Sequence, residues 1–294
     1  MNVETYPDFT LEAVFESMAS LPVFPKVVHE ALKILDDPNK KIIDVAEIIK
    51  YDVGLVANIL KLTNSALFGL RQQVSDLQTA LTLLGQQKIR EVLITSAALP
   101  YLTKDLHGYE MSPEDLWLHS VGCALISEVI TERFNFENAS SLYTAALLHD
   151  IGKIVLDMYL GPRLFEVLDH ARRNESDFSI AEWEVLGTDH AIAGAAILKQ
   201  WDFPPDIYRA VRNHHDPDLY VQDKLSALLA FCNILAVQLG VGVGANAFRY
   251  RIAPNLMEKI GCTEDDFIWC IERAVTVLET AKDTLNMVFD KEGV

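Results

Sequence analysis

The chain has 294 residues, of which 50% are hydrophobic and 23% are charged. This balance is typical of a globular protein and excludes a disordered chain. The formal net charge of −17 opposes binding to a phosphate backbone, so nucleic acid is not expected as a partner.

The N-terminal third has the periodicity of short helices. Apolar residues recur at helical spacing within 27–35, 42–49, 55–62, 79–84 and 89–99. Pro22 and Pro25 punctuate the first connection, and Gly85 separates the last two segments. No run in the chain alternates with a period of two for long enough to predict a strand, so we expect an all-α fold.

Around residue 108 the sequence becomes polar, and Ser112-Pro113 then provides a strong helix start. We therefore divide the chain into 1–108, an N-terminal helical subdomain, and 109–294, a multi-helix bundle with a C-terminal helical extension. Within the second part, Ser179 with Glu182 predicts a capping box. Residues 263–266 predict the start of the last helix.

Residues 225–248 contain no charged side chain and are long enough to span a bilayer. Asn233 and Gln238 lie inside this stretch, three glycines interrupt its second half, and no basic cluster flanks it. We therefore expect a core helix over 225–239, ended by Gly240, and no membrane partner. The N-terminus has no signal-peptide pattern and the four cysteines show no CxxC spacing, which predicts a cytoplasmic protein with reduced thiols.

Five histidines and one aspartate form a candidate metal site. They are His119, His149, Asp150, His190, His214 and His215. His149 and Asp150 interrupt the apolar run 145–156, where burial requires polar partners. Each histidine falls on or at the end of a predicted helix. Side chains from facing helices can converge on one interior site, and imidazole with carboxylate suits zinc, iron, manganese or nickel.

Each of these residues also has a purely structural interpretation. His119 alone could be a hydrogen-bonded core histidine, and His190 an early-turn residue of its helix. His214 and His215 lie near a helix C-terminus, where a protonated imidazole gains from the helix dipole. Lys153 could extend to solvent. Spacing along the sequence does not decide whether these side chains meet.

The segment His149-Asp150-Ile151-Gly152-Lys153, with His119 before it, resembles the HD superfamily of metal-dependent phosphohydrolases. It is similar to the longer form seen in HD-GYP phosphodiesterases. In the N-terminal part, Leu21-Pro22-Val23-Phe24-Pro25 and Asn64-Ser65-Ala66-Leu67-Phe68-Gly69 resemble the paired-proline entry and the signature of the narrower HDOD family.

The resemblance implies an HD-like helical bundle and a bacterial signal-transduction or regulatory role, with a retained metal-binding site and a protein partner. The alternative is a metal-dependent phosphohydrolase or phosphodiesterase acting on a phosphorylated, nucleotide-type small molecule. The six residues would then hold divalent metal, as many as two ions, which would lower the pKa of a bridging water and orient a phosphate. Asp150 and Lys153 would be catalytic, Asp150 by bridging the ions or assisting proton transfer and Lys153 by stabilising phosphate charge.

Two departures from the related families bear on catalysis. The HD superfamily closes its site with an aspartate in a late helix, where this chain offers Asn233, an uncharged and weaker ligand. His214-His215 leads into Asp216-Pro217-Asp218 rather than a Gly-Tyr-Pro loop. Cyclic-di-GMP is therefore not supported as a substrate.

Overall fold

The computed structural model describes residues 13, 14, 16, 17, 21–245 and 254–289. Helices dominate this part of the chain, and it contains no strand. The one β-type pairing within these ranges is an isolated bridge between Leu106 and Met111. The prediction of an all-α fold is confirmed. None of the described helices has both the length and the apolar composition needed to cross a membrane.

The chain falls into two compact units. One is drawn from residues 23–100 and 276–294, and the other from 1–22 and 101–275. The chain passes between the units after residues 22, 100 and 275, and the last two of these points lie within long helices, α5 (Leu77–Leu102) and α16 (Glu264–Val288). The subdomain limits 1–108 and 109–294 stay a prediction.

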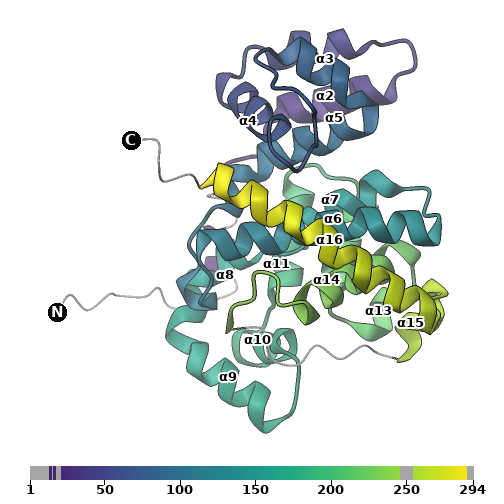
Figure 1. Ribbon diagram of the computed structural model, residues 1–294. Helices are drawn as coiled ribbons and strands as arrows, with labels where there is room; N and C mark the ends of the chain where they lie inside the picture. The colour runs from purple at the N-terminus through teal and green to yellow at the C-terminus, as the bar shows by residue number, and fades with distance from the viewer. Residues whose placement is uncertain (1–12, 15, 18–20, 246–253, 290–294) are drawn as a thin grey trace. The chain divides into compact units, whose positions relative to one another are not determined.

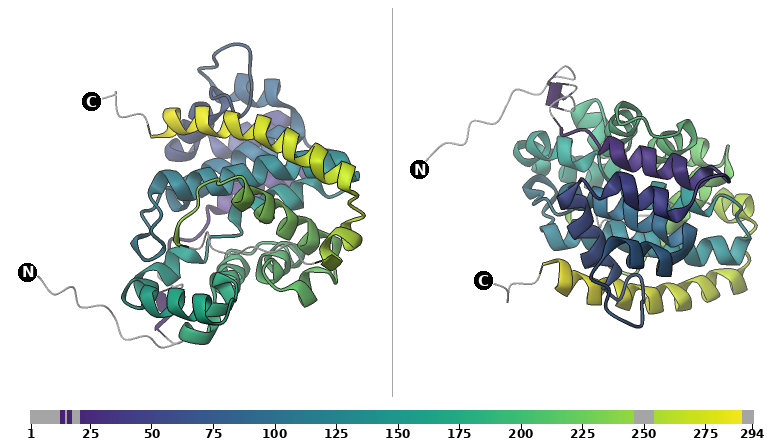
Figure 2. Two further views of the ribbon diagram at one scale, coloured as in Figure 1. Left: turned by 60° about the horizontal axis from the view of Figure 1, so that its bottom comes forward. Right: turned by 90° about the horizontal axis from the view of Figure 1, so that it is seen from above.

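The unit containing residues 23–100 is a small group of helices (Figure 2). It comprises α2 (Lys26–Asp36), α3 (Ile42–Ile49), α4 (Val53–Thr63) and most of α5. Arg90 of α5 donates to the carboxylate of Asp36 at 2.6 Å, and Asn58 of α4 donates to the carbonyl of Ser96 at 3.2 Å. These contacts join α2 and α4 to α5.

Asn64, the first residue of the Asn-Ser-Ala-Leu-Phe-Gly segment, organises the loop after α4. Its amide nitrogen donates to the carbonyls of Leu60 and Val74, both at 2.8 Å. Its amide oxygen accepts from the backbone N–H of Val74 at 2.8 Å. One side chain therefore closes a ten-residue loop from both sides. The asparagine of the signature is explained by this backbone role.

The unit containing residues 101–275 carries most of the helices (Figure 1). They are η1 (His107–Tyr109), α6 (Pro113–Phe134), α7 (Ala139–Leu148), α8 (Lys153–Leu160), η2 (Gly161–Arg163), α9 (Leu164–Arg173), α10 (Phe178–Leu186), α11 (His190–Gln200), α12 (Pro205–Asn213), α13 (Pro217–Tyr220), α14 (Lys224–Gln238), α15 (Pro254–Ile260) and the first part of α16. The helices α6, α7, α12 and α14 pack on one another, and α11 packs on α8 and α12.

Local capping chemistry sets two of the predicted helix starts. Ser112 accepts from the N–H of Asp115 at 3.2 Å at the start of α6, and Thr263 accepts from the N–H of Asp266 at 3.2 Å before α16. Both predictions are confirmed. The predicted capping box of Ser179 with Glu182 is wrong, because α10 begins at Phe178. The carboxylate of Glu182 is instead buried.

The uncharged stretch after residue 224 begins with a core helix. Helix α14 spans Lys224–Gln238, and twelve consecutive residues of it, 225–236, are buried. Asp223 caps its start by accepting from the N–H of Ser226 at 2.9 Å. Gly240 follows with a φ of 69°, the left-handed conformation that ends helices. The predicted core helix is confirmed, and the structure describes the stretch as far as residue 245.

Candidate metal centre

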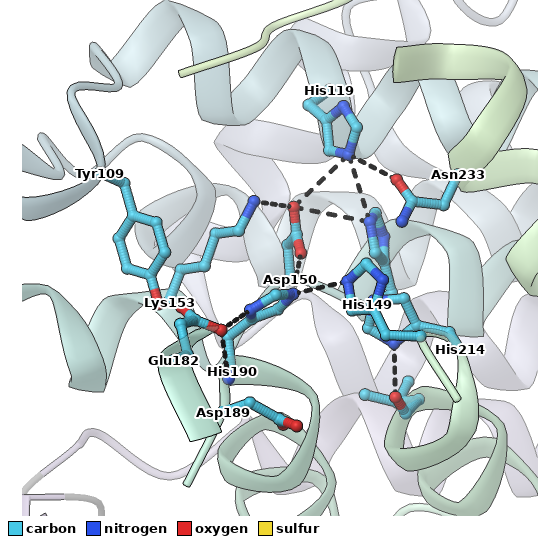
Figure 3. Close-up of polar contacts among 12 residues, drawn as sticks. Tyr109, His119, His149, Asp150, Lys153, Glu182, Asp189, His190, His214 and Asn233 are labelled. Atoms are coloured by element: carbon cyan, nitrogen blue, oxygen red, sulfur yellow. Dashed lines mark hydrogen bonds and ion pairs between the residues drawn. The ribbon is translucent and has the colours of Figure 1, made fainter. Parts of the chain in front are cut away.

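All the predicted metal ligands lie in one cluster inside the unit formed around α6 to α14, together with Lys153. Figure 3 labels these residues except His215. His215 is half-buried and the others are buried. Four segments contribute them: α6 carries His119, the end of α7 and the turn after it carry His149 and Asp150, His190 opens α11, and His214 with His215 follows α12. The convergence that spacing alone left open is therefore observed.

Asp150 lies at the centre of the cluster. Its Oδ2 is 3.4 Å from Nε2 of His119 and 3.5 Å from Nε2 of His149. Its Oδ1 is 3.4 Å from Nε2 of His190, which in turn is 2.8 Å from Nε2 of His215. One carboxylate thus joins a pair of histidines on one side to a group of three on the other. This is the placement that a carboxylate bridging two ions requires.

Backbone carbonyl oxygens accept hydrogen bonds from Nδ1 of three of the histidines and so orient their rings. The acceptors are Val241 for His119, Ala146 for His149 and Val211 for His214, at 2.9, 2.8 and 2.5 Å from Nδ1. A carbonyl oxygen cannot donate, so Nδ1 of each ring carries the proton and Nε2 of the neutral ring keeps its lone pair. Nε2 of His119 and Nε2 of His149 then face each other at 3.2 Å, beside the Asp150 carboxylate. A cation between these acceptors would satisfy all of them.

A ring nitrogen of His214 provides a second observation that favours a bound metal ion. Its Nε2 is buried and has no hydrogen-bond partner among the described residues. His214 also belongs to two groups of donor atoms that lie within 4.8 Å of one another: one with His190 and His215, the other with His149 and Asp150. Since buried polar atoms are normally satisfied, this nitrogen fits a metal ligand better than a packing residue. The donor set as a whole fits divalent metal.

Burial sets the protonation states that a metal site requires. It lowers the pKa of His119 to about 4 and also holds the pKa values of His149, His214 and His215 below the ordinary range. Burial acts to raise the pKa of Asp150, but His149 and Lys153 outweigh it and hold that pKa well below its usual value. Neutral imidazoles and an ionised carboxylate are the forms that bind metal.

Lys153 does not extend to solvent. Its side chain is 1% exposed, and its ammonium lies 2.6 Å from Oδ2 of Asp150 and 5.5 Å from the centre of the Tyr109 ring. The alternative prediction that this lysine extends to solvent is therefore wrong. Its charge balances the buried carboxylate, and this contact places it beside any group bound at Asp150.

Glu182 and Tyr109 are members of the site that sequence reasoning missed. Oε2 of Glu182 accepts from Nδ1 of His190 at 2.5 Å, and its Oε1 accepts from the Tyr109 hydroxyl at 2.5 Å. Burial acts to lower the pKa of His190, but the Glu182 carboxylate reverses this and raises it. A carboxylate behind a histidine orients the ring and strengthens it as a ligand. The spacing of Glu182 from Ser179 indicates a helix cap, and nothing in the sequence marks this residue as a partner of His190.

Two glycines allow the segments of the site to approach one another. A Cβ on Gly152 would collide with the backbone of His190 and of Gly194. A Cβ on Gly242, whose φ is 54°, would collide with the carbonyl of Asp115 and the backbone of His119. Gly152 thus lets the turn after Asp150 sit against α11, and Gly242 lets the Val241 carbonyl reach His119.

Asn233 projects from α14 to the same side of the cluster as His119 (Figure 3). Its amide oxygen lies 3.2 Å from Nε2 of His119. The residue at the position where the resemblance implies a carboxylate would therefore lie within reach of an ion held by His119. A neutral amide there leaves that side of the site with less negative charge.

A pocket of about 440 Å³ opens beside His215. Ile180 and Trp183 of α10 form an apolar side, and Arg212 and Asp216 add charged groups. Trp183 is 49% exposed and Ile180 is 47% exposed. The pocket gives the histidine cluster a solvent-facing side that has both an aromatic surface and a cation.

Comparisons with known proteins identify the family and the fold. The HDOD domain family matches residues 21–217. An HDOD domain protein with unknown function from Geobacter sulfurreducens is 25% identical, with a TM-score of 0.76 over 95% of this chain and 98% of that one. A candidate phosphohydrolase from Shewanella amazonensis is 22% identical, with a TM-score of 0.69 over 94% of this chain and 98% of that one, a likeness of fold.

An uncharacterised protein of Treponema pallidum is 21% identical over 239 residues, or 80% of this chain. The chain spans only 45% of the length of that curated relative. The family match covers well over half of the chain and includes both the Asn64 loop and the site histidines. The chain therefore belongs to the HDOD domain family.

Proposed function

We propose that this chain is a metal-binding regulatory module of signal transduction. Its buried His/Asp cluster holds a divalent ion, with room for a second on the other side of Asp150. The observation that carries the proposal is the facing pair His119 and His149, whose unprotonated Nε2 atoms lie 3.2 Å apart beside a carboxylate. Zinc, iron, manganese and nickel all suit this donor set.

Two features favour binding over turnover. Asn233 supplies no charge at the position where the HD superfamily has an aspartate. Lys153 already neutralises Asp150 through a contact of 2.6 Å. A bound ion in this setting would order α6, α7, α11 and α12 together, because each contributes ligands. We propose that this ordering is what a protein partner in a signalling pathway recognises.

We also propose the cytoplasm as the working compartment and neither nucleic acid nor membrane as a partner. All four cysteines are free thiols, which supports a reducing environment. The net charge of −17 supports the exclusion of nucleic acid.

A metal titration tests the binding proposal. Untagged, chelator-treated protein is titrated with zinc and with manganese while thermal unfolding is followed. We expect a rise in the melting temperature for wild type and for His107→Ala, whose side chain is exposed, and none for His149→Ala. An equal rise in all three proteins would contradict the proposed site.

The second candidate is a metal-dependent phosphohydrolase acting on a phosphorylated, nucleotide-type small molecule. The pocket beside His215 favours it, because Trp183 can stack on an aromatic ring and Arg212 can bind a phosphate. A divalent ion supplies Lewis acidity toward phosphoryl oxygens. Lys153 would stabilise their charge and Asp150 would hold a proton during transfer.

Hydrolysis of bis(para-nitrophenyl) phosphate with added manganese or iron tests this candidate. Turnover by wild type that is lost in His149→Ala and retained in His107→Ala would support an enzyme. If the protein binds metal but hydrolyses neither bis(para-nitrophenyl) phosphate nor nucleotide phosphodiesters, the enzyme candidate is excluded and the regulatory proposal is retained.

A further inference from the structure

Cys123 lies beside the candidate metal site and is not accounted for by the His/Asp donor set. It follows His119 by one turn of α6, so both side chains share a helix face. Its side chain is fully buried, and its Sγ is 3.9 Å from Nε2 of His119. Donor atoms of His119, Cys123 and His149 all lie within 4.8 Å of one another.

Two of the separations among these three donors are close to those around a tetrahedral ion. Zinc binds imidazole nitrogen at about 2.0–2.1 Å and thiolate sulfur at about 2.3 Å. At tetrahedral angles these lengths separate two nitrogens by about 3.4 Å and a nitrogen from a sulfur by about 3.6 Å. The observed separations are 3.2 Å between the histidine nitrogens and 3.9 Å from His119 to the sulfur.

A shortage of negative charge on this side of the site would explain why a thiol is placed there. The side of the site formed by His119 and His149 contains Asn233 where a carboxylate is implied, and the nearest carboxylate oxygen is shared with Lys153. Cys123, whose Sγ lies 3.9 Å from Nε2 of His119, is a further group on this side that can become an anion. A metal-bound thiol is deprotonated, so it would restore the negative charge that Asn233 lacks.

We propose that Cys123 is a thiolate ligand of the ion held by His119 and His149, and that it makes this position selective for thiophilic ions. The inference rests on the proposed metal-binding function. A sulfur–metal bond replaces the S–H bond of Cys123, and the proton is released to solvent, so no oxidant or reductant takes part. The position therefore prefers zinc or iron to manganese or magnesium.

Cys232 provides a matched control. It is fully buried on α14, as Cys123 is on α6. Within the described part of the chain it belongs to no group of metal-binding donors. Replacing either cysteine by serine changes one buried sulfur to oxygen, so the two variants share the cost of the substitution and differ in the proposed ligand.

Cobalt(II) binding tests the inference, because a thiolate bound to cobalt absorbs intensely in the near ultraviolet and nitrogen or oxygen ligands do not. We expect this band in wild type and Cys232→Ser and its loss in Cys123→Ser, together with an about tenfold or greater loss of zinc affinity in Cys123→Ser. Cobalt binding without the band, or a band that survives in Cys123→Ser, overturns the thiolate ligand and leaves the His/Asp site intact.

Two further outcomes keep the test decisive. If wild type binds no cobalt or zinc, the proposed function fails and the thiolate ligand fails with it. If Cys123→Ser does not fold, X-ray absorption at the zinc edge of wild type replaces it. A sulfur scatterer at about 2.3 Å is expected. A shell of nitrogen and oxygen alone overturns the inference.

Discussion

Nδ1 of His190 and Oε2 of Glu182 lie 2.5 Å apart, and both side chains are fully buried. The same carboxylate accepts from the Tyr109 hydroxyl through its other oxygen. This arrangement fixes Nδ1 of His190 as the donor and turns Nε2 toward Asp150 and His215. A carboxylate thus orients His190, whereas backbone carbonyls orient His119, His149 and His214.

Replacing Glu182 by glutamine tests this support. We expect metal affinity on the His190 side to fall by about 10- to 100-fold, because the neutral amide orients the ring less firmly and makes it a weaker base. Glu184→Gln, two residues away on the exposed face of α10, is the control. Competition with a fluorescent chelator measures both. Equal affinities for the two variants would show that Glu182 has only a packing role.

Gly152→Ala should disturb the site through the backbone. The added methyl group has no space against His190 and Gly194, so the turn after Asp150 must move. We expect a loss of about 1–3 kcal/mol in the free energy of unfolding and weaker metal binding. Gly54→Ala is the control, since its Cβ would have only an ordinary contact of 3.7 Å with Asp52. Urea unfolding distinguishes the two, and an unchanged midpoint for Gly152→Ala would count against the close approach.

Metal-free protein should lose stability in mild acid. The ordinary histidine pKa is 6.5 and that of buried His119 is about 4. In this interval the unfolded chain binds a proton that the folded chain does not. The contribution of His119 is therefore complete above about pH 6.5 and is lost as pH falls toward 4, by about 3 kcal/mol. His190, whose pKa is raised, acts in the opposite direction.

Urea midpoints of chelator-treated protein between pH 4.5 and pH 7.5, about the range in which histidine titrates, measure this effect. We expect His119→Gln to flatten the dependence and His107→Gln, an exposed histidine, to leave it unchanged. A wild-type midpoint that does not move with pH would mean that the buried rings are already protonated.

Lys153→Met should make the fold depend on metal. Without the lysine, the buried Asp150 carboxylate loses its partner at 2.6 Å. We expect the metal-free variant to lose about 3–5 kcal/mol. Added zinc should restore more stability to this variant than to wild type, because the ion replaces the missing charge. Lys199→Met, on the exposed face of α11, is the control. Calorimetry with and without zinc reports the difference, and an identical zinc effect in all three proteins would contradict this reasoning.

The sequence predicts the helices and the ligand candidates from local rules. Apolar periodicity and the Ser112 cap anticipate α6, and Gly240 anticipates the end of α14. The His149-Asp150 pair stands out because polar residues interrupt an apolar run. Only the structure shows that the candidate ligands meet, because the contact between α6 and α14 depends on tertiary packing and not on the spacing of residues along the sequence.

The role of Glu182, the burial of Lys153 and the place of Cys123 are not anticipated by the sequence, for different physical reasons. Glu182 has the spacing of a capping residue, and its burial depends on how α10 packs. Lys153 has a long side chain that reaches water in most settings, and here it is enclosed with Asp150 and Tyr109. Cys123 is the one that a local signal could have found, because it lies four residues after His119 on a predicted helix.

The metal content of the purified protein tests whether the His/Asp cluster holds an ion. Untagged protein is purified without chelator, and its zinc, iron, manganese and nickel contents are determined by elemental analysis beside those of His149→Ala and His107→Ala. We expect about one or two divalent ions per chain in wild type and in His107→Ala, and a clear loss in His149→Ala, because His149 belongs to two groups of candidate donor atoms. Wild-type protein that carries no ion and takes up none on dialysis against these metals would contradict it.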